Sequence, residues 1–147
     1  MKTKLTTLLL SLITTFAFGH GEVELGPNGG RILEFSKNES MHGEVTVNGG
    51  KFHIAVLDKD MKPAKMDKQT LTATGGTREK PEKLTVEKSD KGFIVPLVKE
   101  GQWLILQYKE TSDARAVTAR LEYNTQLCGE CKKAEWLCTC GTKEKKK

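Results

Sequence analysis

The chain carries all four of its cysteines within one short C-terminal stretch. Two residues separate Cys128 from Cys131, one separates Cys138 from Cys140, and six lie between the two pairs. A Cys-x-x-Cys pair can place both sulfurs about 2.3 Å from one tetrahedral ion, and four thiolates complete a closed zinc site. Soft thiolates in a tight loop also suit Cu(I). The spacing predicts one local metal site with Cys128, Cys131, Cys138 and Cys140 as ligands.

The same thiols allow a second interpretation, in which they are oxidised to disulfides. Four cysteines permit three pairings, and a bond within the Cys-x-Cys pair would be strained. The other pairings are Cys128–Cys138 with Cys131–Cys140, or Cys128–Cys140 with Cys131–Cys138. An oxidising compartment would favour disulfides, so the location of the protein bears on the chemistry.

The N-terminal sequence predicts export. Lys2 and Lys4 precede an apolar run over residues 5–18, and small residues follow. This order is typical of a secretory signal. We therefore expect a signal peptide over residues 1–19, cleavage before His20, and a periplasmic or secreted mature protein. The run is shorter than the about 20 apolar residues of a transmembrane helix, and we expect no transmembrane segment after cleavage.

The three histidines suggest a separate metal site. Cleavage before His20 would leave a terminal histidine whose α-amine and imidazole together chelate copper, whereas cleavage before Phe18 would remove that chelate. His42 and His53 flank a predicted hairpin. Imidazole is a common metal ligand, although the alternative is three surface histidines with no shared site. The further candidate ligands are His20, His42 and His53.

Between its two ends the chain is patterned as short strands. Runs of β-forming residues recur at intervals of about 8–12 residues, with turn residues between them. Asn48-Gly49-Gly50 separates two such runs and predicts a hairpin. The run over 103–108 is the most apolar, and we expect it to be central. The pattern predicts an all-β fold, an antiparallel β-sandwich or small barrel of about 7–8 strands. The expected strands cover residues 31–35, 44–47, 52–57, 70–74, 84–87, 93–97, 103–108 and 114–123.

We expect one β-sandwich domain over residues 20–123. A cysteine-rich C-terminal segment over 124–142 and a basic tail over 143–147 would follow it. The domain should be complete without the cysteines, and Trp136 and Leu137 should cover the cysteine site or dock it on the sandwich. The expected core consists of Leu33, Phe35, Val45, Val47, Phe52, Ile54, Val56, Leu71, Leu84, Val86, Ile94, Leu104, Leu106, Val117, Leu121 and Tyr123.

The excess of positive over negative charge is confined to the two ends of the chain. The chain has 24 Lys and Arg against 19 Asp and Glu. Residues 1–19 hold two of the positive charges, and residues 143–147 hold four positive charges and one negative. Residues 20–142 therefore carry 18 of each sign. A nucleic-acid-binding domain shows its positive excess on the folded surface, so we expect no nucleic-acid partner.

Known catalytic motifs are missing from the sequence. It contains no Gly-x-Ser-x-Gly, no His-Glu-x-x-His and no phosphate-binding glycine loop. Redox Cys-x-x-Cys motifs gain their reactivity at a helix N-terminus, and no helix is expected near Cys128 and Cys131. We therefore expect a binding protein and not an enzyme.

A resemblance to a known family accompanies these patterns. The stretch Gly26-Pro27-Asn28-Gly29-Gly30-Arg31-Ile32-Leu33 resembles the N-terminal region of periplasmic adaptor subunits of heavy-metal efflux pumps. Those chains carry Gly-Pro-His-Gly-Gly-Arg-Leu before a small β domain, and the resemblance covers residues 20–123. Asn28 replaces the histidine, which weakens the metal binding expected at that turn. The chain has no room for an adaptor's helical hairpin and further β domains, so the resemblance implies a free-standing relative of the accessory domain.

These observations support two hypotheses of function. The first is an exported binding module for heavy metals, Zn or Cu, with a metal ion and a protein of the cell envelope as partners. The second is a structural or protein-interaction β-sandwich whose cysteines form disulfides and hold no metal.

Overall fold

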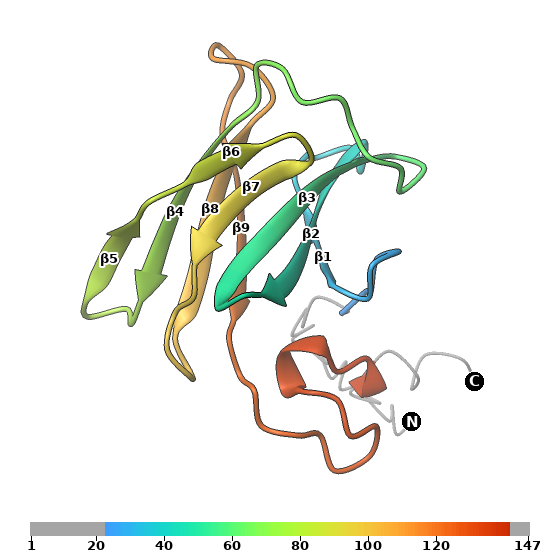
Figure 1. The fold of residues 1–147 in the computed structure, drawn as a ribbon, viewed down its shortest axis with the longest axis vertical. Coiled ribbons are helices and arrows are strands. Elements are labelled where there is room, and N and C mark those ends of the chain that lie inside the picture. Colours follow the sequence, from blue (N-terminus) through green and yellow to red (C-terminus); the bar gives the residue numbers. More distant parts are fainter. Residues whose placement is uncertain (1–22, 142–147) are drawn as a thin grey trace, which may run out of the picture.

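The computed structural model describes residues 23–141, which form two packed antiparallel sheets with no α-helix among them (Figure 1). The five-stranded sheet has the order β1-β2-β3-β7-β6, and the four-stranded sheet has the order β5-β4-β8-β9. The expected signal peptide, His20 and the basic tail lie outside the described residues. The elements are β1 (Arg31–Glu34), β2 (Met41–Asn48), β3 (Lys51–Asp58), β4 (Thr70–Gly76), β5 (Pro81–Leu84), β6 (Glu87–Ser89), β7 (Gly92–Pro96), β8 (Trp103–Lys109), β9 (Val117–Glu122) and the 3₁₀ turn η1 (Glu135–Leu137).

The all-β sandwich predicted from the sequence is confirmed, with nine strands in the described part of the chain. The expected single strand over residues 84–87 is wrong. Leu84 ends β5 in one sheet, and Glu87 begins β6 in the other. Apolar and polar residues alternate from Leu84 to Glu87, across the junction of the two strands, so the pattern does not reveal that the chain changes sheets there. The expected central strand over 103–108 is confirmed as β8, between β4 and β9.

The predicted hairpin at Asn48 is confirmed and sets the register of the five-stranded sheet. Asn48 pairs with Lys51 across a two-residue turn, in which Gly49 has φ 56° and Gly50 has φ 72°. Two successive positive φ angles are the requirement of the hairpin turn whose twist matches that of the strands. The register of β2 on β3 follows from this turn.

The core lies between the inner faces of the two sheets. Phe35 and Tyr108, from different sheets, stack with ring centroids 4.5 Å apart and an interplanar angle of 11°. Three predicted core residues lie elsewhere: Val47 is 39% exposed, and Ile94 and Val117 are only half-buried. The inward-facing residues of β7 are Phe93 and Val95. The apolar run over 93–95 has no alternation, so its pairing with β3 decides which side chains face inward.

The hydroxyl of Tyr108 is the one buried side-chain oxygen or nitrogen among residues 23–141 without a hydrogen-bond partner. Burial, with a smaller contribution from the charge of Glu110, raises the pKa of Tyr108 to about 12. We expect Tyr108→Phe to raise the free energy of unfolding by about 1 kcal/mol, because it removes an unsatisfied buried group and keeps the stacked ring. Urea denaturation measures the change. Tyr123→Phe, at a half-buried ring, is the control, and a loss of stability in Tyr108→Phe would contradict the expectation.

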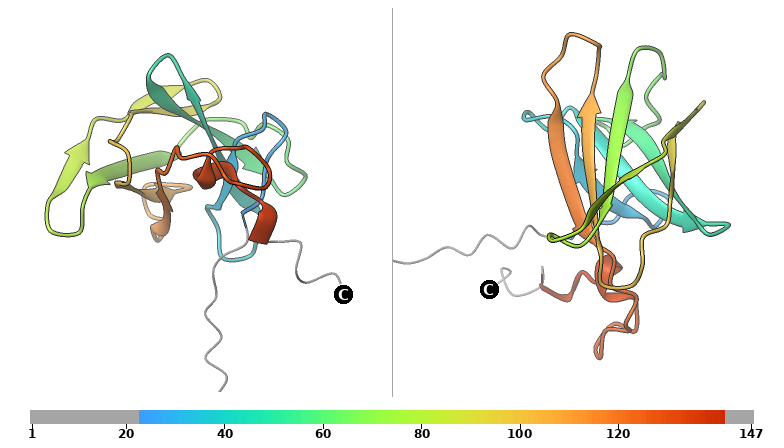
Figure 2. Two further views of the ribbon diagram at one scale, coloured as in Figure 1. Left: turned by 90° about the horizontal axis from the view of Figure 1, so that it is seen from below. Right: turned by 90° about the vertical axis from the view of Figure 1, so that its left-hand side faces the viewer.

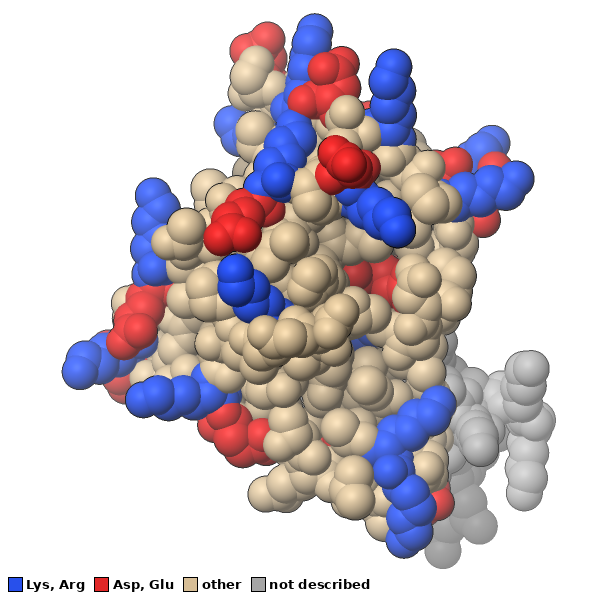
Figure 3. Space-filling view, in the orientation of Figure 1, with Lys and Arg blue, Asp and Glu red and all other residues tan. Residues whose placement is uncertain are grey.

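Charges of both signs are interspersed over the face of the molecule in Figure 3, with no extended patch of one sign on that face. This distribution agrees with the equal numbers of positive and negative residues in positions 20–142. No helix within residues 23–141 has the length and apolar character to cross a membrane.

Candidate metal centre

The cysteine-rich segment over residues 124–141 leaves β9 and folds across one end of the sandwich, at the bottom of Figure 1 and in both views of Figure 2. Two backbone hydrogen bonds fold it into a narrow ribbon. The N–H of Glu135 donates to the carbonyl of Gln126 at 2.8 Å, and the N–H of Cys128 donates to the carbonyl of Lys133 at 2.8 Å. The ribbon turns the chain back, so the second cysteine pair lies against the first.

The first cysteine pair sits in a tight turn. The N–H of Lys132 donates to the carbonyl of Cys128 at 3.1 Å, and Lys132 adopts φ 59°. Hydrogen bonds from the backbone N–H groups of Cys131 and Glu130 to the Cys128 thiol lower its pKa to about 7. The thiolate is the form of cysteine that binds metals, and this turn stabilises it.

The four sulfur atoms form a compact group. The Sγ atoms of Cys128 and Cys140 are 3.8 Å apart, as are those of Cys131 and Cys138, and all four lie within 4.8 Å of one another. Four sulfurs placed tetrahedrally around an ion at about 2.3 Å would be about 3.8 Å apart. The predicted clustering of the four cysteines is confirmed, and its dimensions suit a tetrahedral metal ion.

The group is accessible from solvent on one side. Cys128 is buried, with 7% of its surface exposed, whereas Cys131, Cys138 and Cys140 are half-buried. Hydrogen bonds with the side chains of Cys138 and Cys131 raise the pKa of Cys140, because they favour its protonated form. A bound cation would instead favour the thiolate. Within residues 23–141 no other set of three or more Cys, His, Asp or Glu is grouped closely enough to hold a metal.

An aromatic cluster holds the segment on the sandwich. The indole of Trp136 is buried and packs against Phe52, at a centroid distance of 6.5 Å, and Tyr123, at 5.7 Å. The carbonyl of Trp136 accepts a hydrogen bond from Arg31 Nη1 at 3.3 Å, and its N–H donates to the Asn124 carbonyl at 3.0 Å. Trp136 therefore docks the segment as expected. It also belongs to the hydrophobic core of the sandwich.

The structure does not bring the candidate histidines together. His42 pairs with Leu57, and His53 pairs with Thr46, so the two histidines are four residues apart along the strands. That offset corresponds to about 13 Å. Because His20 lies outside the described residues, the terminal chelate stays a prediction.

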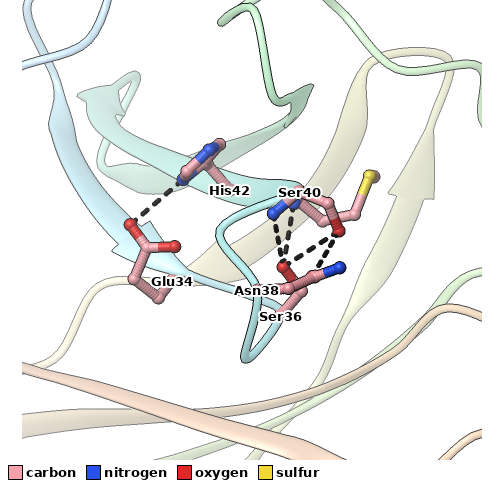
Figure 4. Close-up of polar contacts among 6 residues, drawn as sticks. Glu34, Ser36, Asn38, Ser40 and His42 are labelled. Atoms are coloured by element: carbon pink, nitrogen blue, oxygen red, sulfur yellow. Dashed lines mark hydrogen bonds and ion pairs between the residues drawn. The ribbon is translucent and has the colours of Figure 1, made fainter.

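His42 is buried instead of lying on the surface. Only 4% of its surface is exposed, and its Nδ1 lies 3.1 Å from Oε1 of Glu34 on the neighbouring strand. The two side chains point toward one another in Figure 4, beside a turn held by Ser36 and Ser40. One ring nitrogen of His42 is therefore paired with the carboxylate of Glu34.

The sequence patterns miss a buried carboxylate on β2. Glu44 is 0% exposed, and its Oε1 accepts hydrogen bonds from the backbone N–H groups of Asn28, at 2.7 Å, and Gly30, at 3.0 Å. Its Oε2 accepts from Nδ2 of Asn28 at 2.7 Å. A Cβ at Gly26 would lie 2.5 Å from the Glu44 carboxyl carbon, so a larger residue there would displace this carboxylate. The glycine-rich turn therefore encloses Glu44 and supplies its hydrogen bonds.

Comparisons of the chain with protein-family models, with characterised proteins and with solved structures give no match. The candidate site therefore rests on its own geometry. The resemblance of residues 20–123 to efflux-pump adaptor subunits stays an expectation from the sequence.

Proposed function

We propose that this protein is an exported module that binds a heavy-metal ion, Zn²⁺ or Cu(I), through Cys128, Cys131, Cys138 and Cys140. The observation that carries the proposal is the group of four sulfurs, all within 4.8 Å, with two separations of 3.8 Å. A tetrahedral set of four thiolates is typical of Zn²⁺, and soft thiolates also bind Cu(I). The N-terminal charge and apolar pattern supports export.

Partial exposure of the ligands supports metal handling as the role. Cys131, Cys138 and Cys140 are half-buried, so a competing ligand from a partner can approach three of the four sulfurs. Ligand exchange at an accessible thiolate site allows an ion to be taken up and passed on. The partner would be a protein of the cell envelope, in keeping with the proposed location.

A second candidate function has a specific observation in its favour. The sulfurs of Cys128 and Cys140, and those of Cys131 and Cys138, are each 3.8 Å apart, and these pairs correspond to one of the two unstrained pairings. If an oxidant removed two hydrogens from each pair, the segment would be closed by two disulfides. The protein would then be a structural or protein-interaction β-sandwich without a metal.

Mass spectrometry of the exported protein separates the two functions. Under native, non-reducing conditions, the metal-binding function predicts one metal ion per chain and four free thiols after denaturation. A mass lower by four hydrogens, with no metal, would support the disulfide-bonded domain. Titration of the reduced protein with Co²⁺ provides a second measurement. Saturation at one equivalent, with sulfur-to-cobalt charge-transfer absorption and tetrahedral d–d bands, is the expected result.

A further inference from the structure

The cysteine-rich segment has two buried side chains between residues 124 and 141. They are Cys128, a proposed metal ligand, and Trp136, which packs in the aromatic cluster of the sandwich. The rest of the segment is exposed or half-buried, and its regular secondary structure is the three-residue turn η1. So little buried apolar surface does not offset the entropy lost when a segment of this length is ordered.

Trp136 links the four-cysteine site to the aromatic cluster of the sandwich. Trp136 lies between Cys131 and Cys138, and the N–H of Cys138 donates to the carbonyl of Glu135 at 3.0 Å within the same turn. An ion bound to both cysteine pairs would close this part of the chain into a loop. The loop would hold Trp136 at a set distance from the metal, facing Phe52.

We propose that the segment is a metal-dependent strap, in which occupancy of the four-cysteine site holds Trp136 in the aromatic end of the sandwich. This inference rests on the proposed metal binding. It adds that the bound metal controls whether the segment stays docked on the sandwich. Without the ion, the segment detaches and uncovers Trp136, Phe52 and Tyr123. The protein then has two states that differ in exposed aromatic surface.

The physical basis is the linkage between metal binding and folding. A metal that binds only the ordered segment contributes its binding free energy to that order. Linkage is reciprocal, so contacts of Trp136 with the sandwich must also raise the affinity for the metal. A thiol cluster that only bound a metal on a freely moving tail would show neither effect.

Tryptophan fluorescence tests the strap directly. The chain has two tryptophans, and Trp103→Phe leaves Trp136 as the single indole. Trp103 is 40% exposed and lies outside the aromatic cluster, so this change should leave the fold intact. In the reduced protein, Zn²⁺ is expected to shift Trp136 emission to shorter wavelength and to protect it from acrylamide, and a chelator should reverse both effects. Equal emission and quenching with and without Zn²⁺ would overturn the strap.

A variant of Trp136 tests the reciprocal effect. Zn²⁺ at about 100 times its Kd should raise the Tm of the wild-type sandwich by about 10 °C. In Trp136→Ala that rise should fall below about 2 °C, and Zn²⁺ affinity should drop by about tenfold or more. Leu127→Ala is the matched control, because Leu127 adjoins Cys128 but is 71% exposed, and it should keep the full rise. If Trp136→Ala does not fold, the fluorescence measurement decides.

Cobalt absorption separates failure of the strap from failure of metal binding. If the tetrahedral Co²⁺ bands saturate at one equivalent while Zn²⁺ leaves Trp136 emission and Tm unchanged, the metal site stands and the strap is wrong. If the Co²⁺ bands are absent, metal binding and the strap both fail.

Discussion

Cys128→Ser is expected to lower the affinity of the reduced protein for Zn²⁺ by at least about 100-fold. Loss of an outer-shell partner already lowers the metal affinity of a site 10–100-fold, and this change removes a direct ligand. Cys128 is also the buried sulfur of the group, and the backbone N–H groups of Cys131 and Glu130 stabilise its thiolate. Competition against a chromophoric zinc chelator measures the change.

Histidine variants are the control for this experiment. His42→Gln and His53→Gln should bind Zn²⁺ at the cysteine site with unchanged affinity, because neither residue belongs to the sulfur group. A large loss in either variant would point to a site that includes imidazole. Equal Zn²⁺ affinity in Cys128→Ser and the wild-type protein would rule out the four-cysteine centre.

Glu44→Ala is expected to lower the free energy of unfolding by about 3–5 kcal/mol. Glu44 is fully buried and accepts three hydrogen bonds from Asn28 and Gly30. Removal of the carboxylate leaves the buried N–H of Gly30 without a partner, at about 1–3 kcal/mol, removes both hydrogen bonds of the more exposed Asn28, and opens a cavity beneath the turn. Urea denaturation with fluorescence detection measures the loss.

Two further variants, one at position 44 and one two residues along β2, show whether the carboxylate causes the loss of stability. Glu44→Gln keeps one acceptor oxygen but directs an amide N–H₂ toward the donor groups, so an intermediate loss is expected. Thr46→Ala changes the same face of β2 without removing the turn's acceptor, and its loss should stay below about 1 kcal/mol. An unchanged urea midpoint in Glu44→Ala would show that the turn does not depend on this carboxylate.

The class of fold and the presence of one cysteine site follow from the amino-acid sequence alone. Strand signals are local, since alternation and turn residues act within a few positions. The hairpin at Asn48-Gly49-Gly50 follows directly from the φ angles that glycine permits. The four cysteines are so close in the chain that any compact folding of residues 128–140 brings their sulfurs together.

How these parts meet depends on tertiary contacts, because those contacts join residues far apart in the sequence. In the alternating run over 44–47, Glu44 and Thr46 are the polar positions expected to face solvent, but Glu44 is buried because the turn over 26–30 closes on it. Leu84 and Glu87 lie in different sheets because their hairpins join different strands: β5 pairs with β4, which pairs with the distant β8, whereas β6 pairs with β7, which pairs with the distant β3. The cysteine segment is held on the sandwich by Trp136, whose partner Phe52 lies on a distant strand. The positions of these residues are set by pairing and packing between distant segments. Local sequence patterns carry no information about those contacts.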